Sequence, residues 1–261
     1  MDILPVITSR DNARIKRMCA LRDSEKQRTA AGLLFAEGPK LCLELAKDCP
    51  LTELYATQAA LDHTPALAAF GDRTTLIAPH VAEKLAGTRS SQDVFGLFRA
   101  PSTDPAPLLQ TARRILALEG VQDPGNVGTL LRSAAAFGFD GVLLGPGCAA
   151  PFSPKVLRSS MGAAGRMPVG LCHDLPAALE KLRARGITCL AAALYQARPL
   201  DAVGTDLSGG VCVVIGSEGQ GLTDAAVAAC DAAVRIPMTD RVESLNAGVA
   251  GSVLLWHFRG V

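Results

Sequence analysis

Three polar or glycine-rich turns in the C-terminal half of the chain constrain its fold more than any other feature. They span residues 122–133, 215–222 and 236–246, and each follows a β-like apolar run and precedes a helix-like run. This alternation predicts an α/β domain with a mostly parallel sheet that is covered on both faces. Ligands bind such sheets at the carboxyl ends of the strands. The three turns therefore predict one composite site at that edge.

The same alternation gives the expected elements of this half. We expect strands near 115–118, 141–144, 187–192, 211–215 and 233–236, and helices near 126–137, 154–163, 175–185, 222–229 and 244–258. In the N-terminal part we expect helices at 11–30 and 39–46 and short strands at 33–37, 54–56, 75–77 and 94–98. The N-terminal part is therefore predicted to be a small α/β unit.

A proline-rich stretch marks the domain boundary. Residues 101–107 contain three prolines, which predicts a linker over 101–111. The linker would join a first domain, residues 1–100, to a second domain, residues 112–261.

Composition narrows the class of protein. Hydrophobic residues make up 49% of the chain and aromatic residues 4%, which suits helices packed on a sheet better than a β-sandwich. A net charge of +1 excludes a globally basic nucleic-acid binder but allows a local basic face. No apolar run reaches membrane-spanning length, and residues 1–5 lack the form of a secretion signal. We expect a cytoplasmic protein, or one in an organelle matrix after import.

Cysteine and histidine spacing gives no metal site. The eight cysteines never lie two to four residues apart, and the four histidines are scattered. The cysteines are interpreted as small reduced core residues.

The first turn suggests a site for phosphate. Asn126 is expected to cap the helix that carries Arg132 and Ser133. At about 100° per residue, Asn126 and Ser133 share one face, whereas Arg132 lies off it. Arginine binds phosphate in a two-pronged way. The alternative is an ordinary cap and a surface cation.

The second and third turns add polar groups and flexible backbone. Glycines at 216, 219 and 221 would let the backbone approach a flat ligand, and Glu218 is either a site residue or a carboxylate at a helix start. In the third turn Ser244 can cap the following helix, and Asn246 is a second polar residue where an apolar helix begins. The small residues after it indicate close packing on another backbone or on a second subunit.

Together these blocks resemble the motifs of SpoU-type RNA ribose 2′-O-methyltransferases, members of the SPOUT class. The resemblance runs from about residue 115 to the C-terminus, and residues 153–162 are similar to the family's substrate-side segment. Residues 7–16, 35–38 and 92–95 resemble, more weakly, an RNA-binding domain related to kink-turn-binding ribosomal proteins.

The resemblance implies a fold, a methyl donor and a set of site residues. It implies a trefoil knot, an exception to the usual unknotted rule, that binds S-adenosylmethionine, and a homodimer with the active site near the subunit interface. Donor contacts would come from Gly216, Ile236, Met238 and Leu245. The family's polar site positions correspond to Asn126, Arg132, Glu218, Ser244 and Asn246.

Two positions depart from the family pattern. Asp240 stands where the family more often has glycine, which puts donor affinity in question. Residues 91–93, Ser-Gln-Asp, replace a more common Pro-Gln-Gly.

The implied reaction is methyl transfer to a ribose 2′-hydroxyl, with large ribosomal RNA favoured over transfer RNA. Because an arginine side chain stays protonated in proteins, Arg132 is expected to bind phosphate and stabilise developing charge rather than act as a base. A second hypothesis is a catalytically idle RNA-binding protein of the same fold. A nucleotide-dependent oxidoreductase is disfavoured because the dinucleotide fingerprint is missing from the first strand.

A basic segment near the N-terminus is the candidate RNA contact. Residues 10–28 contain seven Lys or Arg and three acidic residues. A solvated charged helix is the alternative reading, and the catalytic motifs favour RNA. The proposed contacts are Arg10, Arg14, Lys16 and Arg17, with Arg158 in the second domain.

Overall fold

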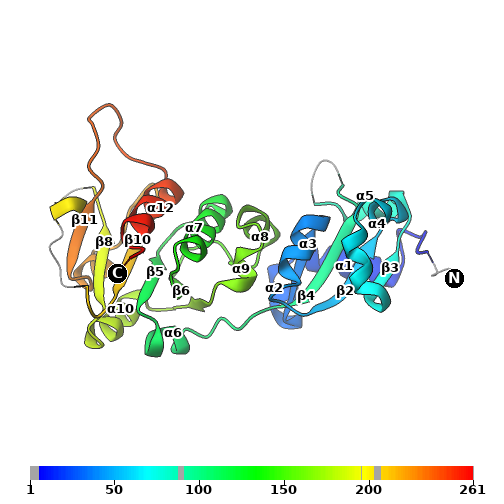
Figure 1. The fold of residues 1–261 in the computed structure, drawn as a ribbon, viewed down its shortest axis with the longest axis horizontal. Helices are drawn as coiled ribbons and strands as arrows, with labels where there is room; N and C mark the ends of the chain where they lie inside the picture. The colour runs from blue at the N-terminus through cyan, green and yellow to red at the C-terminus, as the bar shows by residue number, and fades with distance from the viewer. Residues whose placement is uncertain (1–5, 88–90, 195, 203–206, 261) are drawn as a thin grey trace. The chain divides into compact units, whose positions relative to one another are not determined.

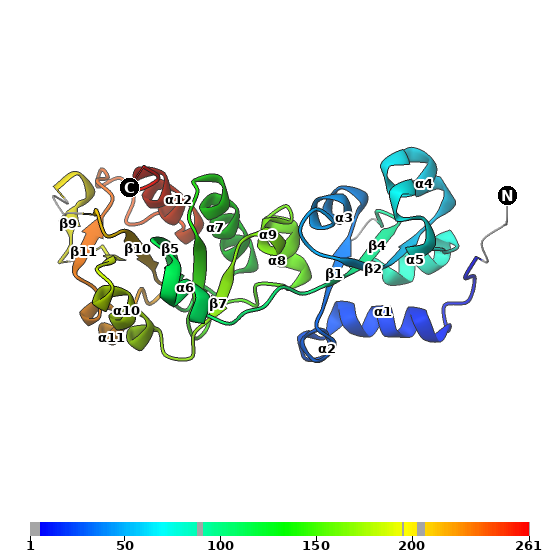
Figure 2. The ribbon, with the colours of Figure 1, turned by 60° about the horizontal axis from the view of Figure 1, so that its bottom comes forward.

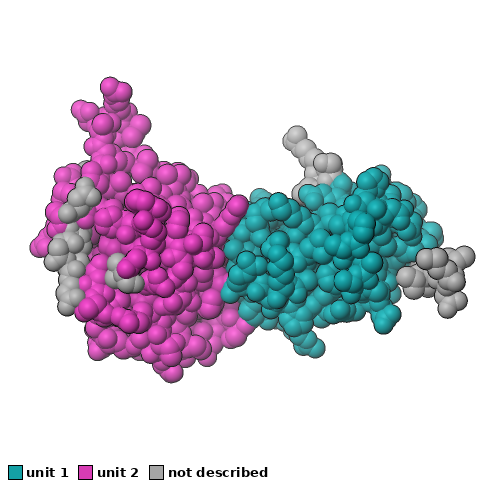
Figure 3. All heavy atoms as spheres, viewed as in Figure 1, with its two compact units in different colours: residues 1–101, 152–166 teal, residues 102–151, 167–261 magenta. Residues whose placement is uncertain are grey.

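The chain forms two compact units in a computed structural model that describes residues 6–87, 91–194, 196–202 and 207–260. Unit 1 consists of residues 1–101 and 152–166, and unit 2 of residues 102–151 and 167–261 (Figure 3). The first division falls in the proline-rich stretch. Part of the expected linker is nevertheless a helix, α6 (Ala106–Thr111), whose Leu108 is buried in the core of unit 2.

Unit 1 is built on a four-stranded mixed sheet. Its strands are β1 (Leu33–Glu37), β2 (Leu51–Ala56), β3 (Thr74–Leu76) and β4 (Val94–Arg99), in the order β1-β4-β2-β3. β4 pairs antiparallel with β1 and β2, while β3 pairs parallel with β2. All four expected strands are confirmed to within a few residues at their ends.

Helices cover both faces of this sheet (Figure 2). On one face α1 (Ala13–Asp23) and α5 (Pro79–Leu85) bury Ile15, Met18 and Val81 against strand side chains that include Phe35 and Tyr55. The other face carries α3 (Pro39–Leu45), α4 (Gln58–His63) and the 3-10 helix Pro65–Arg73.

The single helix expected over 11–30 is two helices. Ser24 has an extended backbone that ends α1, and its side chain accepts a hydrogen bond from the Gln27 N–H to cap α2 (Glu25–Ala31).

The segment 152–166 interrupts the sequence of unit 2 and packs in unit 1. It forms α8 (Pro154–Ser159) and α9 (Ala163–Arg166) instead of the one helix expected over 154–163. The Arg166 Nε lies 2.9 Å from the Asp48 carboxylate, and the Cys49 thiol points at the Gly165 carbonyl at 3.5 Å. These contacts attach the segment to the end of α3 and the turn after it.

Unit 2 is a seven-stranded parallel sheet. The strands are β5 (Arg114–Leu118), β6 (Gly141–Leu144), β7 (Val169–Leu171), β8 (Thr188–Ala192), β9 (Arg198–Pro199), β10 (Val211–Ile215) and β11 (Ala232–Arg235). Their order is β7-β6-β5-β10-β8-β11-β9, and every pairing is parallel. The expected parallel sheet is confirmed, whereas the short edge strands β7 and β9 were not predicted.

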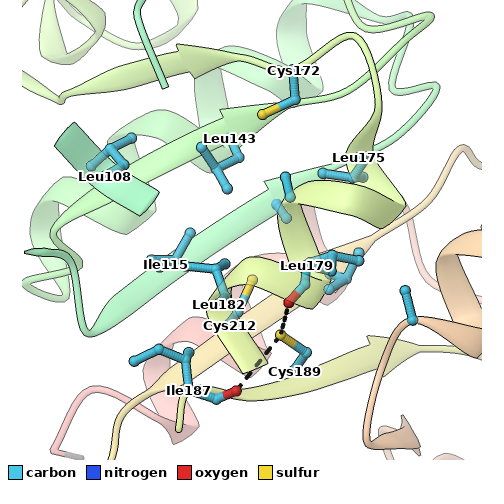
Figure 4. Packing of buried hydrophobic residues seen from close by; sticks show 14 of the residues in the cluster. Leu108, Ile115, Leu143, Cys172, Leu175, Leu179, Leu182, Ile187, Cys189 and Cys212 are labelled. Atoms are coloured by element: carbon cyan, nitrogen blue, oxygen red, sulfur yellow. Dashed lines mark hydrogen bonds between the residues drawn. The ribbon is translucent and has the colours of Figure 1, made fainter. Parts of the chain in front are cut away.

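Two layers of helices enclose this sheet (Figures 1 and 2). α7 (Pro124–Ala136) and α12 (Ala247–His257) pack side by side on one face. α6, α10 (Leu175–Ala184) and α11 (Asp224–Ala228) lie on the other. Figure 4 shows this second layer, where leucines of α10 pack with Cys189 and Cys212 on adjacent strands.

In the described part of the chain, no helix is long and apolar enough to cross a membrane.

Two capping predictions are wrong. α7 begins at Pro124 because the Asp123 side chain accepts from the Asn126 N–H at 2.9 Å, so Asn126 lies inside the first turn. α12 begins at Ala247 with Asn246 as its cap, which accepts from the Val249 N–H at 3.2 Å, so Ser244 lies before the helix.

Candidate active site

The carboxyl ends of β5 and β10 bring the first two turns together. The Glu119 N–H, just after β5, donates to the carbonyl of Ile215, the last residue of β10, at 2.9 Å. The next residues of β10's turn fold back, with Ser217 and Gly221 joined by two backbone hydrogen bonds. A Cβ at Gly216 would meet the Gly221 carbonyl carbon at 2.2 Å, so only glycine fits this reversal.

Glu218 connects all three motifs through one carboxylate oxygen. Its Oε1 accepts from the Asn126 side-chain amide at 2.7 Å and from the Asn246 amide at 2.6 Å. It also accepts from the Ala247 backbone N–H at 3.1 Å. The three turns expected to form one composite site therefore meet in the structure, around the carboxylate of Glu218.

The seam between α7 and α12 extends this cluster. The Ser133 and Ser252 hydroxyls lie 2.8 Å apart, so Asn126 and Ser133 do share the face that meets α12. A Cβ at Gly248 would approach the Asn126 Oδ1 at 3.1 Å, and one at Gly251 would overlap Leu130 at 2.2 Å. Small residues in α12 thus let the two helices pack closely.

Arg132 stands apart from the cluster. It lies in α7, its residue is exposed, and no hydrogen bond or ion pair of its side chain occurs among residues 6–87, 91–194, 196–202 and 207–260. A cation left free in this way can bind an external anion.

Two of the expected donor contacts lie near the two ends of the third turn. Ile236 follows β11, and Leu245 lies just before the α12 cap; both are partly buried. Between them Met238 and Ser244 are exposed, Met238 to 39%. Figure 1 shows this stretch as a loop that extends from the sheet of unit 2 between β11 and α12. The structure does not place Ser244 or Met238 at the Glu218 cluster.

Asp93 and Asp240, which stand where the family more often has glycine, differ in backbone conformation. Asp93 has a φ of 57°, in the left-handed region that favours glycine. Asp240 is not among the described non-glycine residues with positive φ. The aspartate at 240 therefore needs no unusual backbone, whereas the one at 93 does.

Sequence reasoning missed Glu119. Its carboxylate accepts from the Thr223 N–H at 2.9 Å and from the Thr223 hydroxyl at 3.1 Å, which fastens the start of α11 to the end of β5. A carboxylate directly after a buried parallel strand was the available signal.

The basic side chains of α1 are paired with acids. Arg17 and Arg14 lie 2.5 and 3.7 Å from Glu53, and Lys16 lies 3.2 Å from Asp11. Arg10 pairs with Glu83 at 2.9 Å, and Arg158 lies 4.0 Å from the buried Glu37.

Tyr55 joins this network. Burial first, and then the hydrogen bond to Glu53, raises the pKa of Tyr55 to about 12. The phenol therefore stays protonated, donating to Glu53 at 2.6 Å and accepting from the Arg14 Nε at 2.9 Å.

No group of three or more His, Cys, Asp or Glu that could hold a metal ion occurs among the residues that the structure describes.

Two family models match the chain. The SpoU rRNA Methylase family matches residues 113–256, and the MRM3-like substrate binding domain matches residues 12–96. The first match includes segment 152–166, which packs in unit 1.

Full-length relatives support the same family. The 23S rRNA (guanosine(2553)-2′-O)-methyltransferase RlmP of Bacillus subtilis is 30% identical over 256 residues, which covers 97% of this chain and 99% of that protein. A solved putative RNA methyltransferase of the TrmH family from Porphyromonas gingivalis is 30% identical, with a TM-score of 0.80 over 94% of this chain and 97% of that one. The AdoMet-bound rRNA methyltransferase of Sinorhizobium meliloti is 25% identical, with a TM-score of 0.84 over 98% and 97%.

Proposed function

Because the chain belongs to the SpoU rRNA methylase family, we propose that it transfers a methyl group from S-adenosylmethionine to a ribose 2′-hydroxyl of large-subunit ribosomal RNA in the cytoplasm. One observation carries the proposal: the Glu218 carboxylate gathers the three motif segments beside a helix that presents Arg132, whose side chain has no partner among the described residues.

The residues at the strand ends fit a flat, partly apolar donor. The turn after β10 exposes glycine backbone at 219 and 221, and Met238 exposes an apolar side chain after β11. Backbone groups near Gly216, Ile236 and Leu245 would hold the donor, with Met238 against it. When bound, the sulfonium donor supplies an electrophilic methyl group.

The polar residues of the site have separate proposed roles in binding the RNA and in positioning the turns. Arg132 binds the phosphate next to the target ribose and stabilises negative charge as the 2′-oxygen loses its proton. The proton passes to that phosphate or to solvent, because arginine is too weak a base. Asn126 and Asn246 act through Glu218: their amides already donate to its carboxylate, so they position the turns. Ser244 shapes the loop before α12.

We also propose that the active form is a homodimer. α12 is apolar on nearly all sides, yet Val249, Val253 and Trp256 are exposed by 49%, 38% and 53%. They line a groove of about 320 Å³ with Thr129, Gly248 and Ser252. A helix that is apolar all round is normally buried, and a second copy would cover this face beside the site.

The strand order supports the proposed trefoil knot. β10 lies between β5 and β8, and after β11 the chain returns across the sheet to place α12 against α7. A knot formed by this return would wrap the third turn around the donor.

The test is direct. Ribosomal RNA from cells that lack the gene would be incubated with the purified protein and methyl-labelled S-adenosylmethionine. We expect label in large-subunit RNA at a single bond that has become resistant to alkali, since a methylated 2′-oxygen cannot attack the adjacent phosphate. Label in transfer RNA instead would establish the other substrate. No label, with donor and RNA both bound, would identify a catalytically idle RNA-binding protein.

A further inference from the structure

Unit 1 contains a polar cavity that no part of the proposed reaction uses. It measures about 420 Å³, within the range of small-molecule sites, which is roughly 300–1,000 Å³. We call it the Arg14 cavity; its lining residues are Val6, Ile7, Thr8, Ser9, Asn12, Arg14, Thr74 and Thr75. Six of the eight have polar side chains, and none is acidic. This lining suits a hydrogen-bonding ligand without positive charge.

Arg14 is held in place on this cavity. Its Nε donates to the Tyr55 hydroxyl at 2.9 Å and its Nη2 to the Thr75 hydroxyl at 3.0 Å, while the guanidinium lies 5.1 Å from the centre of the Tyr55 ring. A guanidinium has five N–H donors, so these two bonds leave others for a ligand. Its side chain is still 52% exposed. A fixed, partly exposed guanidinium is well suited to bind phosphate.

The start of α1 favours an anion at the same place. Asn12 caps this helix of 11 residues, and its first turn contains no acidic residue. Arg14, Lys16 and Arg17 lie close to this end, where the helix dipole is positive and cations are disfavoured. An anion bound at this end of α1 would offset that unfavourable interaction.

We propose that the Arg14 cavity binds one nucleotide of single-stranded RNA, with its phosphate on Arg14 and its base or ribose against the hydroxyl and amide groups of the lining. The inference rests on the proposed function and adds the point at which unit 1 holds the substrate. It also distinguishes Arg14 from Arg17, which pairs more closely with Glu53 and does not line the cavity.

Arg14→Met and Arg17→Met form a matched pair. Both side chains lie on α1, both pair with Glu53, and they are 52% and 51% exposed. Binding of a fluorescent single-stranded octaribonucleotide to the full chain would be measured by anisotropy at several salt concentrations, without methyl donor. We expect Arg14→Met to weaken binding roughly tenfold and to lower the log–log salt slope by about 0.7, and Arg17→Met to change affinity by less than about twofold.

A third variant tests the cavity rather than the charge. Thr8→Phe places a bulky side chain in the lining, and its backbone carbonyl can keep the hydrogen bond with His80. We expect a loss of octanucleotide affinity similar to that of Arg14→Met, with an unchanged melting temperature.

Three results would overturn the inference. These are equal losses for the two arginine variants, wild-type binding by a folded Thr8→Phe protein, or displacement of the octanucleotide by uridine monophosphate or inorganic phosphate at equal concentration. The last would make the ligand a free phosphate compound. Because no donor is present, failure of the proposed methyl transfer would appear separately, as bound RNA without methylation.

Discussion

The two units use charged side chains in opposite ways. Every ion pair among the described residues lies in unit 1 except Arg183–Asp231. In unit 2 the Glu218 carboxylate accepts hydrogen bonds from neutral amides, and Arg132 has no partner in the described ranges. Exposed ion pairs contribute little stability, so the pairs of unit 1 mainly orient its cations. In unit 2, by contrast, Arg132 has no such partner in the described ranges, which fits the phosphate-binding role proposed for it.

Of the substitutions considered, replacing Arg132 should have the largest effect on the methylation rate. It is also the most stringent test of the difference between arginines with and without a partner among the described residues. Arg132→Ala should lower the methylation rate by on the order of 10²-fold or more, because a charge contact made in the transition state is lost. Donor affinity, measured by calorimetry, should stay nearly constant. Arg183→Ala removes the paired arginine of the same unit and should leave the rate unchanged. A near-normal methylation rate for Arg132→Ala would show that the arginine without a partner in the described part of unit 2 has no role in the reaction.

Glu218→Ala should give the next largest effect. Its carboxylate anchors the end of the third turn, so its loss should weaken donor binding by roughly tenfold. Gln220→Ala, in the same turn, is the control, because only the Gln220 backbone bonds to Ser217. Equal donor affinities for the two variants would show that the cluster does not organise the donor site.

A charge placed on the exposed apolar face of α12 would test whether this face of unit 2 forms the dimer interface. Val253→Asp would bury a carboxylate in the proposed dimer interface and should raise the dimer dissociation constant roughly tenfold or more. Val227→Asp is the matched control on α11, since the two valines are 38% and 37% exposed. Sedimentation velocity would separate dimer from monomer. If the Val253→Asp protein stays as dimeric as its control, the interface lies elsewhere.

The smallest effect compares one aspartate in each unit. Asp93→Gly should raise the free energy of unfolding by up to about 1 kcal/mol, because glycine adopts a φ of 57° without strain. Asp240→Gly should lower it by up to about 1 kcal/mol, through the greater entropy of the unfolded chain. Chemical denaturation would measure both. Changes of the same sign would mean that backbone conformation does not decide these positions.

Local pattern accounts for the elements that sequence reasoning predicted well. Apolar runs such as 211–215 and 141–144 coincide with β10 and β6, because strands buried on both faces are continuous apolar runs. The short strands β7 and β9 have too few residues to show any pattern. The strand order could not be read either, since it depends on pairing between distant segments.

The candidate site likewise combines residues that could be predicted from the sequence with contacts that could not. Glu218, Asn126 and Asn246 were identified from motif position, but that one carboxylate oxygen binds both amides is a tertiary fact. Asp123 displaced Asn126 as the helix cap because two adequate caps stood three residues apart, and sequence could not choose between them. The acidic partners of α1, Glu53 and Glu83, lie far along the chain, so the pairing of its cations was equally hidden.

The position of segment 152–166 sets the order in which the protein can mature on the ribosome. Pro101 completes the first stretch of unit 1, yet the unit gains its last two helices only once Arg166 has been made. At about 5–20 residues per second, the nascent first unit waits several seconds with the end of α3 uncovered. During that interval the strands β5 and β6 emerge. Unit 1 is thus completed only after synthesis of unit 2 has begun, so the ribosome cannot release unit 1 as a finished domain before it makes the first part of unit 2.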